Sequence, residues 1–197
     1  MLIDPNHVAR SLCALSALFV KNPRGRNFVP QIAAYRLDRL LGLDMVPVTV
    51  SREVDGEAGS LQFMPTNTTT EERRSASGGG SSAWCPLPEQ WNAMYVFDVL
   101  IDNPGRGWGR MLYSRDNWQL ILIRNGETFD TGRDRPAYLR DVPLELGDAW
   151  IEALHGLEEG ALQEYFAGVL SKRRISALLK RRDRLVEDAQ VAQVASQ

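Results

Sequence analysis

Several residue types that carry recognisable chemistry are scarce in this chain of 197 residues. It has two cysteines and two histidines, too few for a disulfide framework or for a zinc site with familiar spacing. The formal charge of −2 shows no excess of positive charge, so we expect no nucleic-acid partner. No continuous apolar stretch approaches the roughly 20 residues that a membrane-spanning helix needs.

The first residues also lack the pattern of an export signal. The segment MLIDPNHVAR has an acidic residue and an early proline where a signal peptide has a basic region followed by an apolar one. Together with two cysteines interpreted as reduced thiols, this pattern predicts a cytoplasmic protein. The apolar content of 44% is enough for one well-filled core, or for two small lobes that share one.

Residues 94–130 have the most informative pattern. Apolar residues at three-and-four spacing at the start of this segment predict a buried helix. Pro104 and the glycines after it end that helix in a basic loop. Residues 111–114 and 120–123 are typical of two short strands around a polar turn, and a second glycine-containing loop follows them.

The N-terminal part predicts strands and one helix. Residues 12–20 are a short apolar run, either a buried strand or a piece of helix, and Lys21 follows directly. Residues 30–42 predict a helix, because proline suits its first turn and glycine its end. Residues 45–51 and 59–64 alternate apolar and polar side chains around a turn, which predicts an antiparallel hairpin.

The rest of the chain predicts a linker and further helices. Residues 65–83 contain almost no large apolar groups, so we expect a flexible linker there. Residues 148–154, 157–170 and 172–194 have the apolar periodicity of three helices. The last of these carries a basic cluster that predicts a solvated surface, with an anionic partner as the minority alternative: Lys180, Arg181, Arg182 and Arg184.

The order helix, loop, strand, turn, strand, loop over residues 94–130 resembles the catalytic segment of atypical kinases. This group includes lipid kinases, HipA-like toxin kinases and secretory-pathway kinases. Its first loop has the form Asp-Arg-x-x-x-Asn, and its second loop has the form Ile-Asp-x-Gly-x-x-Phe. In this chain the corresponding segments are GRGWGR at residues 105–110 and IRNGETF at residues 123–129.

The resemblance implies an α+β fold of the two-lobed atypical kinase type. Residues 1–64 would form a reduced N-terminal lobe, residues 65–83 the linker, and residues 84–197 a mainly helical C-terminal lobe that contains the catalytic hairpin, residues 103–130. No glycine precedes Leu12, so the glycine-rich strand pair that covers the phosphates in most kinases would be missing and the small lobe truncated.

The resemblance also implies that the catalytic groups are lost. Gly105 stands in the place of the aspartate that orients the attacking hydroxyl, and glycine has no side chain for this role. Arg110 and Arg124 stand where an asparagine and an aspartate hold the metal ions. Arginine only donates hydrogen bonds and stays cationic, so it repels a divalent metal. We therefore expect a degenerate member of the group, a pseudokinase with no intact catalytic residue.

Other positions correspond to the nucleotide site of the resembled kinases. Lys21 would pair with the phosphates, and Gln31 stands at or near the position of its acidic partner, where a neutral amide forms no ion pair. Leu61 and Met64 would border the adenine pocket. A surface lysine at the end of a strand and an ordinary sheet edge are equally consistent with these residues.

Three functional hypotheses follow. In the first, a pseudokinase without a required cofactor holds a protein partner in the old cleft. In the second, an active kinase has rearranged chemistry, in which Asp102, Asp130 or Asp134 carries the metal while Lys21 holds phosphate, although carboxylates beside arginines are more often paired with them. In the third, glycine amides and guanidinium groups bind ATP or another anion without metal, through Arg106, Arg110 and Arg124.

Overall fold

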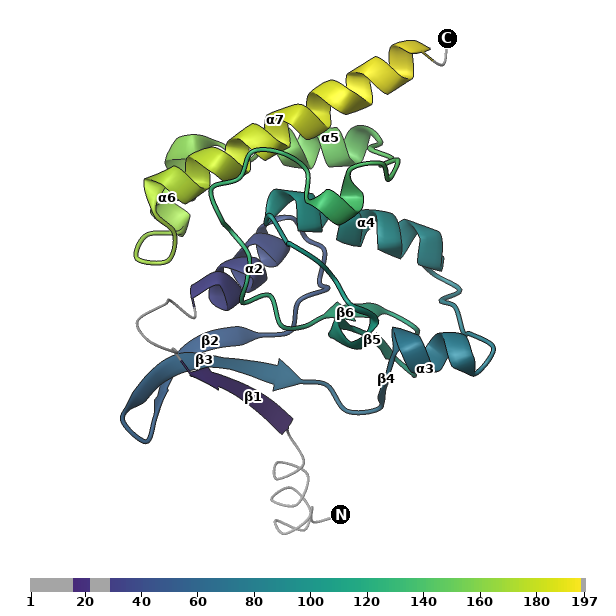
Figure 1. Ribbon diagram of the computed structural model, residues 1–197, viewed down its shortest axis with the longest axis vertical. Coiled ribbons are helices and arrows are strands. Elements are labelled where there is room, and N and C mark those ends of the chain that lie inside the picture. Colours follow the sequence, from purple (N-terminus) through teal and green to yellow (C-terminus); the bar gives the residue numbers. More distant parts are fainter. Residues whose placement is uncertain (1–15, 22–28, 196–197) are drawn as a thin grey trace, which may run out of the picture.

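The computed structural model describes residues 16–21 and 29–195, and these residues form a mixed α/β fold (Figure 1). They contain two antiparallel sheets of three strands each. The first sheet has the order β1-β3-β2 and consists of β1 (Ser16–Lys21), β2 (Thr49–Val54) and β3 (Glu57–Met64). The second sheet has the order β4-β5-β6 and consists of β4 (Thr68–Thr70), β5 (Met111–Ser114) and β6 (Leu120–Leu122).

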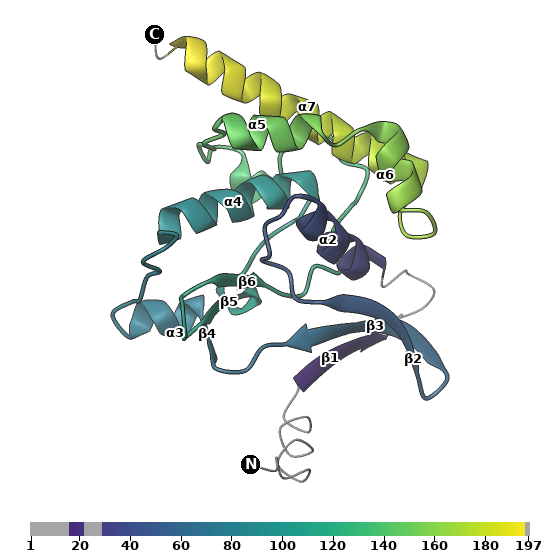
Figure 2. The ribbon, with the colours of Figure 1, turned by 180° about the vertical axis from the view of Figure 1, so that it is seen from behind.

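Six α-helices and two short 3₁₀ helices complete the described part of the chain. The α-helices are α2 (Val29–Leu40), α3 (Glu71–Ala76), α4 (Leu87–Leu100), α5 (Asp148–His155), α6 (Glu159–Tyr165) and α7 (Lys172–Ala195). The 3₁₀ helices are η2 (Trp108–Arg110) and η3 (Ala137–Leu139). Seen from either side, α2 lies between the first sheet and the layer of C-terminal helices (Figures 1 and 2). No helix in the described ranges is long and apolar enough to cross a membrane.

One apolar core joins most of these elements. It takes buried side chains from α2, α4, β5, β6 and the C-terminal helices, including Leu37, Phe97, Leu122 and Leu178. Among the described residues, none from β1, β2 or β3 belongs to this cluster. The covered face of the first sheet carries buried polar residues instead, namely Thr49, Ser60 and Gln62. The first sheet therefore lies outside the main core.

A short connection ties α2 to the second sheet. Asp38 in α2 is fully buried, and its carboxylate accepts hydrogen bonds from the backbone N–H groups of Met45 (2.9 Å) and Val46 (3.1 Å). The Met45 carbonyl in turn accepts from Leu122 N–H in β6 at 2.8 Å. This fixed connection positions α2 against the part of the chain that follows β6.

The structure confirms most of the predicted elements. The predicted helix 30–42 is α2, the strands 111–114 and 120–123 are β5 and β6, and the three C-terminal helices are α5, α6 and α7. The predicted hairpin is also present, and its turn has Asp55 and Gly56 at φ +53° and +76°. Part of the predicted element 12–20 lies outside the described residues, and its remainder is in β1.

The prediction of a flexible linker over residues 65–83 is wrong for its central part. Thr68, Thr69 and Thr70 form β4, which pairs with β5 so that Thr69 lies opposite Tyr113. The Thr70 hydroxyl then caps α3 by accepting from Arg73 N–H. Three β-branched residues suit a strand once a partner strand is present, and threonine suits an N-cap. Pairing with β5, which is distant in the sequence, therefore makes this segment a strand despite its polar composition.

Arg181 contradicts the prediction that the basic cluster of α7 is solvated. Its side chain is fully buried and donates to the Leu100 carbonyl from Nε (3.2 Å) and Nη2 (2.9 Å), and to the Gly132 carbonyl. Burial lowers the pKa of Arg181 to about 10, so the side chain remains cationic at neutral pH. A cation at the C-terminal end of α4 also suits the helix dipole.

Candidate functional site

Two loops that carry the residues identified from the sequence lie side by side. The first loop, residues 103–110, follows α4 and ends in η2, and the second loop, residues 123–129, follows β6. Backbone hydrogen bonds join the two segments: Ile123 N–H donates to the Arg110 carbonyl (3.2 Å), and Phe129 N–H donates to the Ile101 carbonyl (2.5 Å). The two predicted loops therefore form one structural unit.

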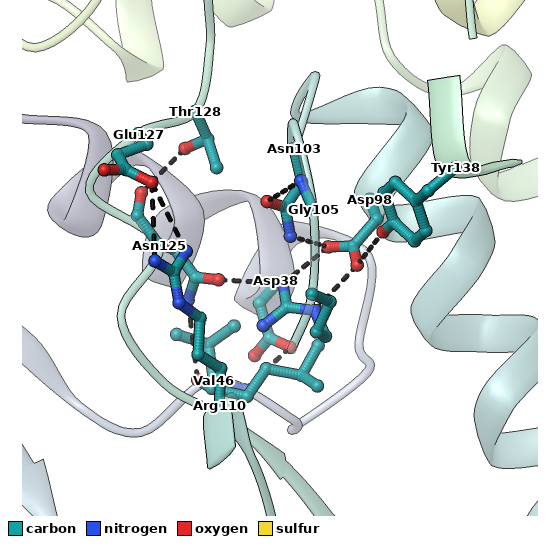
Figure 3. A network of polar contacts seen from close by, with 12 residues as sticks. Asp38, Val46, Asp98, Asn103, Gly105, Arg110, Asn125, Glu127, Thr128 and Tyr138 are labelled. Atoms are coloured by element: carbon teal, nitrogen blue, oxygen red, sulfur yellow. Dashed lines mark hydrogen bonds and ion pairs between the residues drawn. The ribbon is translucent and has the colours of Figure 1, made fainter. Parts of the chain in front are cut away.

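A buried polar network centred on Asp98 holds this unit together (Figure 3). Asp98 lies near the end of α4 with no exposed surface. Its carboxylate accepts from Asn103 Nδ2 (2.9 Å), from Arg106 Nε (2.7 Å) and from the hydroxyl of Tyr138 (2.6 Å). Arg106 Nη2 donates both to Asp98 and to Asn125 Oδ1, the latter at 2.9 Å. Arg106 thus connects α4 to both loops.

The network contains an ion pair in the protein interior. Burial alone would lower the pKa of Arg106, but the Asp98 carboxylate outweighs burial and raises that pKa above its ordinary value. Burial, followed by the charge of Asp98, also raises the pKa of the Tyr138 hydroxyl. The guanidinium is therefore charged, and the phenol keeps the proton that it donates to Asp98.

This geometry corrects the prediction that Arg106 binds a nucleotide or another anion. Its side chain is 1% exposed, and its guanidinium is bonded to Asp98 and Asn125 inside the protein. An anion from solvent would have to break a buried bidentate pair to reach it. The predicted cluster of three loop arginines therefore does not form a common site.

Three loop residues at which the resemblance implies lost catalytic groups are at least partly exposed, namely Gly105, Arg110 and Arg124. A Cβ atom at Gly105 would have no neighbour within 4 Å, so the space beside this residue is open. The Arg110 guanidinium lies 3.4 Å from the Glu127 carboxylate, and this partly exposed pair bridges the loops. Arg124 is exposed, and its backbone has a φ of +59°. None of the three residues offers a side-chain oxygen.

The carboxylates considered as rearranged metal ligands have separate contacts. Asp134 pairs with Arg184 of α7, and Asp130 accepts from the backbone N–H of Thr131 at 2.8 Å. Asp102 lies 3.8 Å from the buried Arg181. Within residues 16–21 and 29–195, no three side chains of the histidine, cysteine, aspartate and glutamate types form a group that would hold a metal.

Lys21 ends β1, but its side chain lies on the exposed face of the first sheet. A Cβ atom at Gly59 would lie 2.6 Å from the Phe19 ring, so positions 19 and 59 share a face. Lys21 pairs directly with Gly59 and alternation places it on the same face as Phe19. The buried Ser60 and Gln62 define the other, covered face. This placement does not support the expected contact between Lys21 and nucleotide phosphates beneath the sheet.

No protein-family model matches the chain, and no curated protein matches it. Among solved structures, the chain is similar to the Helicobacter pylori proinflammatory kinase CtkA, with 13% sequence identity and a TM-score of 0.55. The match covers 85% of this chain and 82% of that chain.

The fold is kinase-like. At such low sequence identity the similarity concerns the fold alone.

In this kinase-like fold, Gln31 does lie against the second loop. It is buried in the first turn of α2, and a Cβ atom at Gly126 would lie 3.7 Å from its Cγ and Nε2 atoms. Its Oε1 atom has no hydrogen-bond partner among the described residues. The resemblance implies an acidic partner of the lysine at or near this position, and Gln31 is a neutral, buried amide.

Leu61 and Met64 lie on opposite faces of the first sheet. Leu61 pairs with Phe19 on the exposed face, whereas Met64 pairs with Ser16 on the same face as Gln62. Residues three apart in a strand point to opposite sides, so the two side chains do not line one pocket beneath the sheet. This placement contradicts the prediction that both residues border one adenine pocket.

Sequence reasoning missed Asp98 and Tyr138. Asp98 interrupts the apolar run of α4 between Phe97 and Val99, and a carboxylate in a buried helix requires a cation or several donors. That signal was present in the sequence, but the identity of the partners was not. Tyr138 comes from η3, 40 residues further along the chain.

Proposed function

We propose that this protein is a kinase-like protein that has lost phosphoryl transfer and acts by binding a protein partner, in a regulatory or scaffold role. The observation that supports this most strongly is the chemistry of the two loops. At three positions where the resembled kinases use carboxylate or amide oxygens, the chain has Gly105, Arg110 and Arg124. Without these oxygens, neither an attacking hydroxyl nor a divalent metal is held.

The positive charge that the two loops carry gives further support. Arg110 is already paired with Glu127, and Arg124 is exposed nearby on the second loop, so the loops present cations where a metal would sit. A cationic side chain repels a divalent metal ion. The residues therefore do not fit a divalent metal, no cofactor is required, and ATP would bind only in a metal-independent manner.

A phosphoryl-transfer assay tests the proposal. The purified chain is incubated with radiolabelled ATP, magnesium or manganese, and generic protein acceptors, with the kinase CtkA as a positive control. We expect no transfer above background. Metal-dependent transfer that is lost in Lys21→Ala or Asp130→Ala would contradict the proposal, because the activity would then belong to this chain and use rearranged groups.

Thermal-shift titration separates the remaining hypotheses. The chain is titrated with ATP, with and without magnesium, and its melting temperature is followed. No change supports a scaffold, and a metal-independent increase supports an anion-binding role for the surface arginines. A strictly metal-dependent increase would indicate intact metal ligands and would contradict the loss of phosphoryl transfer.

A designed variant tests whether the three loop positions alone prevent metal binding. The triple variant Gly105→Asp, Arg110→Asn and Arg124→Asp restores the three oxygen-bearing residues of the resembled loops. Open space beside Gly105 accepts a side chain, and aspartate tolerates the positive φ at residue 124. We expect the variant to gain manganese binding by calorimetry, whereas the natural chain shows none.

A further inference from the structure

A cavity of about 380 Å³ lies between α2, β2 and the turn that joins α6 to α7. These three segments can be followed in Figure 2. Much of the wall is apolar, with branched side chains from each segment: Val29, Ile32, Val50 and Val169. The volume is in the range of sites for small molecules, which combine apolar walls with a few polar groups that orient the ligand.

Helical spacing places this cavity and the second loop on different sides of α2. Val29, Ile32 and Arg36 line the cavity and follow one another at three-and-four spacing, so they share one face of the helix. Gln31, which lies against Gly126 of the second loop, is the residue before Ile32 and projects about 100° away from it. No described residue of the two loops lines the cavity. The cavity is therefore separate from the site of the two loops.

Arg36 is the only charged residue among the described residues that line the cavity. Its side chain is partly buried, and its Nη1 atom donates to the Tyr165 carbonyl at 3.0 Å. Arg36 has no salt bridge with any described residue, and its Nε and Nη2 atoms donate to none of them. The Nε–Nη2 edge of a guanidinium can bind a carboxylate through two parallel hydrogen bonds. This edge is therefore available to an anionic ligand.

Two hydroxyl groups of β2 also line the cavity. Thr49 Oγ1 is already bonded, since it donates to the Pro47 carbonyl at 2.8 Å and accepts from Gln62 Nε2 at 2.9 Å. The exposed hydroxyl of Ser51 has no hydrogen bond with a described residue, so it can donate to a ligand. One guanidinium neutralises one negative charge, whereas a phosphate monoester carries nearly two at neutral pH. The polar groups thus favour a monoanion.

We propose that this cavity binds a small carboxylic acid with an aliphatic body. The carboxylate accepts hydrogen bonds from Nε and Nη2 of Arg36, and the Ser51 hydroxyl is a further donor. The aliphatic body lies against the apolar wall formed by Val29, Ile32 and Val169, where its area is removed from water. This inference goes beyond the proposed loss of phosphoryl transfer and does not depend on it, because the two loops do not line the site.

Isothermal titration calorimetry of the full chain with octanoate tests the proposal. We expect saturable binding with a Kd on the order of 0.1–1 mM, as for a ligand with few heavy atoms. Octan-1-ol has the same aliphatic body without the charge and should bind at least about tenfold more weakly. Butyrate keeps the carboxylate but lacks most of the apolar area, and it should also bind at least about tenfold more weakly.

Matched variants of the protein identify the site. Arg36→Gln should weaken octanoate binding at least about tenfold, and Arg36→Lys, which keeps the charge without the fork, should give an intermediate affinity. Arg52→Gln is the control, because Arg52 is an exposed arginine of β2 that does not line the cavity. Ser51→Phe retains Arg36 but adds a ring at the exposed side of the cavity, so it should also weaken binding at least about tenfold. Thermal unfolding without ligand identifies the variants that fold.

Three outcomes would overturn the proposal. They are the absence of saturable binding up to roughly 10 mM octanoate, equal affinity for octan-1-ol, and unchanged affinity in folded Arg36→Gln or Ser51→Phe. Tighter binding of octyl phosphate than of octanoate would overturn it in favour of a phosphate ligand. Tighter binding of the peptide acetyl-Gly-Gly-Leu would overturn it in favour of the C-terminus of a protein. The phosphoryl-transfer assay is independent, so an active kinase that still binds octanoate would contradict only the proposed loss of transfer.

Discussion

The carboxylate of Asp98 and the guanidinium of Arg106 both lie inside the protein, and each is stable there only because of the other. Removing an ion from water is costly, and the cost is offset when a bidentate partner and further hydrogen bonds satisfy the charge. Here Asn103, Asn125 and Tyr138 supply the additional bonds. At the scale of single residues, this network bonds both loops to α4.

Asp98→Asn should destabilise the protein by about 3–5 kcal/mol, because it leaves Arg106 as an uncompensated buried charge. Urea unfolding followed by circular dichroism measures the effect. The matched control is Glu127→Gln, which breaks the exposed pair with Arg110 and should cost less than about 1 kcal/mol. Equal costs for the two substitutions would contradict the assigned role of Asp98.

Arg124→Asn should raise the free energy of unfolding by about 0.5–1 kcal/mol. The residue has a φ of +59°, a region that asparagine adopts far more readily than arginine, and the side chain is exposed. Arg140→Asn is the control, since Arg140 is also exposed but has an ordinary φ of −55°. A gain at residue 140 that equals the gain at residue 124 would show that backbone strain is not the cause.

At the scale of secondary-structure elements, long-range side-chain contacts attach the helices to one another and to the second sheet. Arg181 joins α7 to the end of α4 and to the segment after the second loop. Trp91 of α4 donates from Nε1 to the hydroxyl of Tyr113 in β5 at 2.7 Å. Each contact satisfies a polar group that would otherwise be buried without a partner.

Arg181→Met should destabilise the protein by about 2–4 kcal/mol, because the carbonyls of Leu100 and Gly132 lose their buried donors. Thermal or chemical unfolding provides the measurement. Lys180→Met changes the neighbouring residue of α7, which is exposed, and should alter stability by no more than about 0.5 kcal/mol. A small effect at residue 181 would mean that water replaces the guanidinium.

Tyr113 should make stability depend on pH in the alkaline range. Burial is the largest cause that raises the pKa of Tyr113 from 10 to about 12. Between these values the folded protein keeps a proton that the unfolded chain has released, so the contribution of Tyr113 falls as the pH rises, by about 1.4 kcal/mol per pH unit.

Urea unfolding between pH 9.5 and 11.5 should therefore give a shallower pH dependence for Tyr113→Phe than for the natural chain. Tyr165→Phe, at an exposed position of α6, is the control for the chemical change alone. The same slope in the natural chain and in Tyr113→Phe would show that the Tyr113 proton is not retained on folding.

At the scale of the whole molecule, the two sheets differ in how much they pack against the main apolar core. The second sheet contributes Met111, Tyr113, Leu120 and Leu122 to the main core, whereas the described strands of the first sheet contribute no residue to it. On the covered face of the first sheet, Ser60 Oγ and Gln62 Oε1 lack partners among the described residues. Burial of apolar area is the dominant stabilising term, so the first sheet should be the less stable one.

Hydrogen–deuterium exchange should show this difference. Peptides that cover residues 49–64 should open with a lower free energy than peptides that cover residues 111–122, because few buried apolar contacts protect the first sheet. Exchange measured by mass spectrometry at increasing urea concentration tests the expectation. Simultaneous loss of protection in both sheets would indicate a single cooperative unit.

The sequence by itself determined the order of the elements and which side chains the two loops carry. Periodicity, turn residues and caps act over a few positions, which is why α2, the hairpin of β2 and β3, β5, β6 and α7 were predicted within a few residues. The identities of Gly105, Arg110 and Arg124 are equally local, so the expected chemistry of those positions could be read directly.

Only the tertiary structure decided which charged residues are inside. Arg181 bonds to a carbonyl 81 residues away, and Arg106 to an amide 19 residues away, so nothing near either residue distinguished it from a solvated arginine. Strand alternation put Lys21 and Phe19 on one face, but which face is covered depends on the rest of the fold. Burial and partner choice depend on contacts between distant segments, and these contacts are set when the chain packs.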